Sequence, residues 1–120
     1  MAWRKRGRIR IEGETVSLSP ARAQALGLCL HELATNAAKH GALSRPEGKV
    51  TVKWRCEDEV LTLHWTERGG PKVTAPSRTG FGATLLSRSL GGPLGGEVAL
   101  DWDEAGLTAE LRLPLNDPGS

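Results

Sequence analysis

The chain has 120 residues, a length that suits one domain able to bury a core without disulfides or a structural metal. Its 38% hydrophobic and 25% charged residues are typical of a folded globular domain and argue against a disordered tail. The formal net charge of +2 is too small to indicate a nucleic acid or an anionic membrane as a partner. No apolar run reaches the ~20 residues that cross a bilayer, and no signal-peptide core is present, so we expect no membrane insertion.

The start of the chain is expected to hold two short strands. Residues 1–7 are locally basic, which we interpret as a linker remnant, with a binding arm as the alternative. Residues 8–12 and 15–19 alternate between apolar and polar side chains, and the Gly13-Glu14 pair between them predicts a turn.

A long helix is predicted to follow, with Ser19 as N-cap and Pro20 in the first turn. Gly41 is placed to end this helix. Gly27 inside it costs about 1 kcal/mol relative to alanine, and we expect it to allow close packing against a sheet. Cys29 in this helix and Cys56 further on lie in apolar patterns without a Cys-x-x-Cys partner, which indicates core thiols in a reducing, cytoplasmic compartment.

The rest of the chain predicts four long strands and a second helix. Residues 49–56 and 61–67 alternate, with Glu57-Asp58 as the turn, and residues 68–79 read as a loop. A helix is expected from about Gly82 to Leu90, and two more strands close the domain. Because each strand has one apolar and one polar face, we predict an α/β (α+β) two-layer sandwich, with a mixed sheet covered by helices on one face.

One face of the long helix carries an acid, an amide and a cation. At roughly 3.6 residues per turn, Glu32, Asn36 and then Lys39 or His40 stack one above another, opposite an apolar stripe. Such a set suits a hydrated metal ion and phosphate oxygens, although an ordinary solvated polar face is the alternative.

Glu67 continues the apolar row Leu61, Leu63 and Trp65, so its carboxylate is predicted to point to the helix side of the sheet. A carboxylate there needs hydrogen-bond donors, and an adenine amino group is a suitable one. The alternative is that the strand ends at Trp65 and that Glu67 is exposed.

Residues 31–43 closely resemble the N box of the GHKL ATPases, the superfamily of gyrase, the 90-kDa heat-shock chaperone and histidine kinases. His31 before the N-box Glu32, and Trp65-Thr66-Glu67 further on, resemble the HWE branch of the histidine kinases. Gly80-Phe81-Gly82 follows in the order expected for this family, and the resemblance runs from about Arg8 to Leu115. It implies a Bergerat-type ATP-binding fold, with residues 8–116 as the catalytic and ATP-binding domain and 117–120 as a tail.

The resemblance also implies roles for single residues. Asn36 would be the Mg²⁺ ligand and Glu67 the reader of adenine, while Glu32 would bind a metal-bound water or act as a general base. Lys39 would contact phosphate, with a solvated lysine as the alternative. His31 and Trp65 are signature residues to which no role is assigned. The further ATP contacts implied are Gly69, Arg78 in a lid over residues 70–79, and Gly80, Phe81 and Gly82 at the β- and γ-phosphates.

By resemblance, the chain is the ATP-binding domain of a bacterial two-component sensor histidine kinase. It would transfer the γ-phosphoryl group of ATP to a histidine on a separate dimerisation helix, and a response regulator would receive it indirectly. His31, His40 and His64 all lie within the predicted ATPase fold and are poor phosphoacceptors. The alternatives are a nucleotide-binding or degenerate interaction module without kinase activity, and a GHKL-type serine kinase, against which the HWE details argue.

Overall fold

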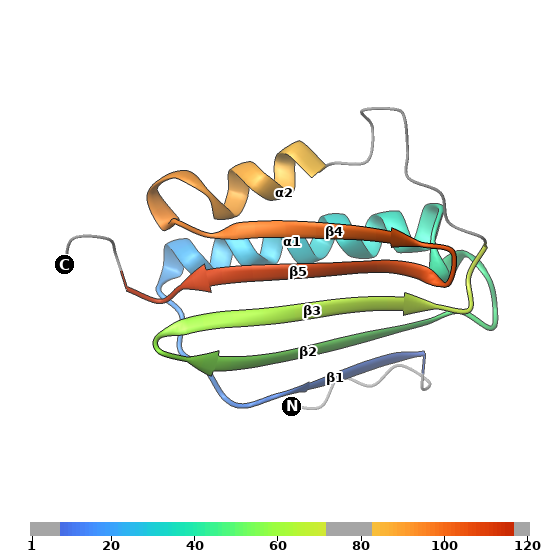
Figure 1. The fold of residues 1–120 in the computed structure, drawn as a ribbon, viewed down its shortest axis with the longest axis horizontal. Coiled ribbons are helices and arrows are strands. Elements are labelled where there is room, and N and C mark those ends of the chain that lie inside the picture. Colours follow the sequence, from blue (N-terminus) through green and yellow to red (C-terminus); the bar gives the residue numbers. More distant parts are fainter. Residues whose placement is uncertain (1–7, 72–82, 117–120) are drawn as a thin grey trace.

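The computed structural model describes residues 8–71 and 83–116. Within these residues the chain forms five strands and two α-helices (Figure 1). Along the chain the elements are β1 (Ile9–Gly13), α1 (Pro20–Lys39), the 3₁₀ turn η1 (Ala42–Ser44), β2 (Lys49–Glu57), β3 (Val60–Arg68), α2 (Ala83–Leu90), the 3₁₀ turn η3 (Gly92–Leu94), β4 (Glu97–Asp103) and β5 (Gly106–Pro114).

The strands form one mixed sheet in the order β1-β2-β3-β5-β4. Only the β1–β2 pair is parallel, and the three other pairs are antiparallel. The apolar rows of the strands face the helices, and they share one core with the buried side chains of α1 and α2. Figure 1 shows α1 running alongside the strands, with α2 next to it. The predicted two-layer α+β architecture is therefore confirmed.

The prediction of a second strand at residues 15–19 is wrong. β1 pairs in parallel with β2, so the chain has to cross over through α1 and cannot fold back in a hairpin. The indole of Trp54 lies over Gly13, where an added Cβ would stand 2.1 Å from the ring. Glu14 then accepts hydrogen bonds from Trp54 Nε1 and, through its side chain, from the Cys56 amide, at 2.7 Å each. These contacts end β1 at Gly13 and direct the chain toward the helix layer.

Helix α1 begins as predicted and ends at Lys39, two residues before Gly41, with His40 as its C-cap. Ser19 caps it by accepting a hydrogen bond from the Arg22 amide at 3.3 Å, and Pro20 occupies the first turn. At the other end, the Gly41 N–H donates to the carbonyls of Asn36 and Ala37. The expectation for Gly27 is wrong, because Gly27 is exposed and an added Cβ would meet no atom within 4 Å.

The structure differs from the sequence predictions in two smaller points, the β2–β3 turn and Cys56. The turn lies one residue later than predicted, at Asp58 and Glu59, which adopt positive φ values of 52° and 63°. Cys29 is fully buried, as expected, whereas Cys56 is only half-buried. None of the described helices is long and apolar enough to cross a membrane.

Candidate functional site

The C-terminal ends of α1 and β3 lie at the same end of the domain (Figure 1). Glu67, near the end of β3, contacts the segment that follows α1 through the Ala42 amide. β3 extends to Arg68, so Glu67 keeps the inward direction of its row and only 3% of its surface is exposed. The predicted inward orientation is confirmed, and the alternative of an exposed Glu67 is wrong. Glu67 Oε1 accepts a hydrogen bond from the Ala42 amide at 3.0 Å, and Oε2 accepts one from Trp65 Nε1 at 2.8 Å.

Glycines bring the backbone segments around Glu67 into close contact. A Cβ on Gly41 would stand 2.3 Å from Glu67 Oε1. Gly69, just after β3, has a φ of +82°, and a Cβ there would stand 2.6 Å from the Glu47 carbonyl oxygen. The resemblance made Gly69 an ATP contact; in the structure it also allows the end of β3 to pass beside the segment before β2.

Asn36 lies one turn before the end of α1, and 9% of its surface is exposed. Its Nδ2 donates to the Glu32 carbonyl at 2.9 Å and to Glu32 Oε2 at 2.7 Å. Both protons of the amide nitrogen are thereby used within α1, which fixes the plane of the amide group. The predicted stack of Glu32 and Asn36 on one helix face is present, with the two side chains in direct contact.

The other predicted site residues are more dispersed. Lys39 and His40 are exposed at the end of α1, and His31 is exposed on a different part of the helix surface. Arg78, Gly80, Phe81, Gly82 and most of the predicted lid lie outside the described residues. Among the described residues, the structure brings Glu32 and Asn36 into direct contact and places Glu67 beside Gly41 and Ala42, just beyond the end of the same helix.

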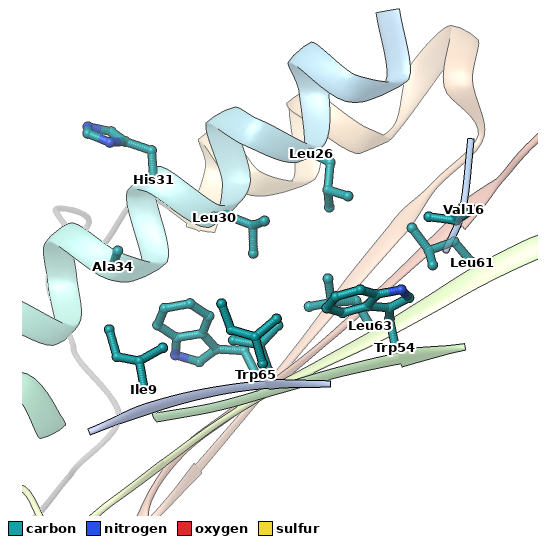
Figure 2. A pocket seen from close by; sticks show the side chains of 12 residues that line it. Ile9, Val16, Leu26, Leu30, His31, Ala34, Trp54, Leu61, Leu63 and Trp65 are labelled. Atoms are coloured by element: carbon teal, nitrogen blue, oxygen red, sulfur yellow. The ribbon is translucent and has the colours of Figure 1, made fainter. Parts of the chain in front are cut away.

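A cavity of about 460 Å³ lies elsewhere, between α1 and strands β1 to β3 (Figure 2). Its walls are almost wholly apolar, which does not suit a triphosphate. Of the predicted site residues that the structure describes, His31 and Trp65 line this cavity. The lining residues are Ile9, Ile11, Val16, Leu26, Leu30, His31, Ala34, Val52, Trp54, Leu61, Leu63 and Trp65.

Two arginines that the sequence did not single out hold the frame of the site. Arg22 is 4% exposed and donates through Nε to the Pro114 carbonyl at 2.7 Å, tying the start of α1 to the end of β5. Arg8 donates to the carbonyls of Leu43, Arg45 and Gly48, and so fixes the segment that follows Ala42. Neither arginine stands in a motif, so only the fold reveals these contacts.

The two thiols are poor nucleophiles at neutral pH. Burial raises the pKa of Cys29 to about 11, and its Sγ lies 3.7 Å from the Leu86 carbonyl oxygen. Burial and, to a lesser extent, the Glu14 carboxylate raise the pKa of Cys56 as well. Both cysteines are therefore protonated at pH 7, and the chemistry of the site has to rest on its oxygen and nitrogen groups.

The known proteins that this chain resembles are histidine kinases. A family model described as a histidine kinase-like ATPase domain matches residues 7–93. Blue-light-activated histidine kinase 1 of Erythrobacter litoralis (strain HTCC2594) is 41% identical over 113 residues, covering 92% of this chain and 31% of that protein. The blue-light-activated histidine kinase of Brucella anthropi is 38% identical over 112 residues, covering 90% of this chain and 23% of that protein. The chain thus spans less than a third of the length of these relatives.

Solved structures agree on the fold. A blue-light activated histidine kinase of Erythrobacter litoralis, EL346, matches with a TM-score of 0.75 at 21% identity, over 90% of this chain and 35% of that one. The catalytic domain of histidine kinase ThkA matches with a TM-score of 0.68 at 16% identity, over 89% of this chain and 77% of that one. With the family match and the relatives above, the chain belongs to the histidine kinase-like ATPase domain family, and over most of its length it is close to the blue-light-activated histidine kinases of the HWE type.

Proposed function

We propose that this domain binds ATP with Mg²⁺ and supplies the γ-phosphoryl group to a histidine on a separate dimerisation helix of a sensor kinase. The observation that carries the proposal is the buried Glu67 carboxylate, held at the end of β3 beside the C-terminal end of the helix that bears Asn36. A response regulator would be the next acceptor. Histidine kinase ThkA, whose fold matches with a TM-score of 0.63 at 17% identity over 90% of this chain and 34% of that one, has been solved in complex with the response regulator TrrA.

Glu67 is proposed to read adenine. An ionised carboxylate can accept about four hydrogen bonds, and in this domain the Ala42 amide and the Trp65 indole supply two of them. Capacity remains for the exocyclic amine of adenine, which is a donor. The carbonyl group that guanine and hypoxanthine carry at the same place is an acceptor, and a carboxylate would repel it. Glu67 would therefore favour adenine over these bases.

Asn36 is proposed to be the Mg²⁺ ligand. The amide nitrogen donates to Glu32, which leaves the amide oxygen as the atom of this group suited to a hard cation. The donor set fits Mg²⁺, since this ion keeps several waters and takes only one or two protein oxygens beside those of phosphates. When bound, it would neutralise charge on the β- and γ-phosphates. Glu32 would orient the Asn36 amide through the 2.7 Å contact and could also accept a proton from a metal-bound water.

Lys39 is proposed to contact phosphate as a point charge, because it is exposed at the same end of α1. Gly69, Arg78, Gly80, Phe81 and Gly82 remain proposed ATP contacts on the family resemblance. With the nucleophile supplied by another segment, catalysis here would consist of positioning and charge neutralisation.

Replacing Asn36 with aspartate tests the metal site. Asn36→Asp keeps the size of the side chain but replaces the amide nitrogen that donates to Glu32 with an oxygen, so two carboxylates would face each other. We expect the Mg²⁺-dependent part of the affinity for a non-hydrolysable ATP analogue to fall at least tenfold by calorimetry, a loss of about 1.4 kcal/mol or more.

The matched control is Asn116→Asp, the same substitution at an exposed position beside Glu59, at the opposite end of β3 from Glu67. It should leave nucleotide affinity as it is. Equal affinities for the wild type and Asn36→Asp with Mg²⁺ would remove Asn36 from the proposal.

Phosphotransfer needs a second experiment. The domain is mixed with labelled ATP, Mg²⁺ and a histidine-bearing dimerisation-helix fragment of a sensor histidine kinase, and the fragment is assayed for acid-labile label. Labelling that depends on this domain and disappears with Asn36→Asp is expected. A domain that binds ATP tightly but never labels the fragment would favour the alternative of a nucleotide-binding module without kinase activity.

A further inference from the structure

Trp65 stands two residues before Glu67, so the two side chains lie on the same face of β3. The Trp65 indole donates to Glu67 Oε2 at 2.8 Å, and both residues are nearly fully buried, at 4% and 3% exposure. We propose that Trp65 is a positioning residue for base recognition: it fixes the Glu67 carboxylate in the orientation that accepts the adenine amine. This proposal rests on the proposed function.

The Glu67 carboxylate is held in one orientation because its two hydrogen-bond donors bind different oxygens. The Ala42 amide binds Oε1 and the Trp65 indole binds Oε2, so each donor holds a different oxygen. One donor alone would leave the carboxylate free to rotate about its last side-chain bond. Two donors on different oxygens fix the plane of the group and, with it, the directions of the remaining lone pairs.

The two donors also stabilise the charge. None of the ion pairs found among the described residues includes Glu67. A buried carboxylate without a cation depends on its hydrogen-bond donors, so the loss of one N–H removes a large part of what holds this group.

Packing holds the indole in place. Trp65 lies opposite Val52 on β2 and opposite Ala109 on β5, and the small Ala109 leaves room beside the ring. The ring also forms part of the wall of the apolar cavity. Figure 2 shows it beneath α1, with its nitrogen turned away from Leu63 and Trp54. Trp65 therefore joins a rigid apolar wall to the recognition carboxylate through one N–H group.

The substitution Trp65→Phe removes the donor and keeps an aromatic ring. The matched control is Trp54→Phe: Trp54 lines the same cavity, but its N–H donates to the Glu14 carbonyl at 2.7 Å, away from Glu67. Glu67→Gln serves as the reference for full loss of carboxylate recognition. All three variants are titrated by calorimetry with ATP and with inosine triphosphate, whose base carries a carbonyl in place of the amine.

We expect the wild type to prefer ATP and the preference to fall roughly tenfold in Trp65→Phe, the size expected for a hydrogen bond to a charged group. Trp54→Phe should keep the wild-type ratio. If Trp65 served stability alone, Trp65→Phe would weaken the binding of both nucleotides equally and leave the ratio of their affinities unchanged. That result would overturn the proposal. If Glu67→Gln also keeps the ratio, the adenine-reading role of Glu67 fails. If Trp65→Phe keeps the ratio while Glu67→Gln loses it, the positioning role of Trp65 fails.

Should Trp65→Phe fail to fold, the wild type provides the test. In nitrogen-15 NMR of the indole groups, saturating ATP should shift the Trp65 resonance and leave that of Trp54 in place. A Trp65 resonance that stays put on ATP saturation would overturn the positioning role.

Discussion

Gly41 lies against the proposed recognition carboxylate of Glu67, and Gly41→Ala tests this contact. The added Cβ would stand 2.3 Å from Glu67 Oε1, whereas ordinary contacts begin at 3.4 Å, so the oxygen has to move by about 1 Å. This movement would break the 3.0 Å hydrogen bond from the Ala42 amide. We expect a loss of about 1–3 kcal/mol for a buried hydrogen bond to a charged group.

One effect opposes this loss and is smaller. Gly41 has a φ of −111°, which is open to alanine, and a ψ of −147°, which lies outside the range that residues with a Cβ favour. Replacing glycine there restricts the unfolded chain, and this offsets at most about 0.4–1 kcal/mol of the loss. The net result should be a free energy of unfolding lowered by about 1–2 kcal/mol, or a melting temperature lower by roughly 4–8 °C for a domain of this size. Affinity for ATP should fall as well, because the carboxylate is displaced.

Gly27→Ala is the matched control, because the same substitution should have the opposite sign. Gly27 lies within α1 with open space around its Cα, so alanine should stabilise the helix by about 0.5–1 kcal/mol. Urea denaturation of both variants measures the two changes, and calorimetry with ATP follows the site. If Gly41→Ala proves as stable as the wild type and binds ATP equally well, the close contact between Gly41 and Glu67 is refuted.

Two further predictions concern residues away from the proposed site. Burial raises the pKa of Cys29 to about 11, so as pH rises this thiol ionises in the unfolded chain before it does so in the folded one. The free energy of unfolding should therefore hold below about pH 9 and decline as pH rises toward 11. Cys29→Ser should flatten this decline in urea titrations across that range, and an unchanged slope would contradict the prediction. Arg22→Met removes the buried hydrogen bond from α1 to the Pro114 carbonyl and should lower the free energy of unfolding by about 2–3 kcal/mol, while ATP affinity stays unaltered. Arg112→Met, at an exposed position, should change neither quantity. An Arg22→Met variant as stable as the wild type would argue against the stabilising role of this hydrogen bond.

The sequence predicts most of the fold because the alternation of side chains is strong in the long strands. The row Leu61, Leu63, Trp65 and Glu67 is one example: its spacing alone places the carboxylate on the helix side, and all four side chains are buried. The Ser19 cap and the first turn of α1 follow from local chemistry in the same way.

What the sequence does not reveal depends on contacts between distant segments. The parallel pairing of β1 with β2 results from the Trp54 ring over Gly13 and from the two hydrogen bonds of Glu14, across about 40 residues of chain. The alternation of residues 15–19 resembles a strand, yet in the described part of the chain these residues pair with no strand. The bond between the Trp65 indole and Glu67 likewise depends on side-chain geometry that a pattern of residue types does not contain.

Calorimetry of the unmodified chain shows whether this domain is a Mg²⁺-dependent ATP site. A non-hydrolysable ATP analogue is titrated with Mg²⁺ and again with a chelator. We expect saturable binding of one nucleotide per chain, with an affinity that falls clearly when Mg²⁺ is removed. Absence of binding at millimolar analogue with Mg²⁺ present would contradict the proposed ATP site.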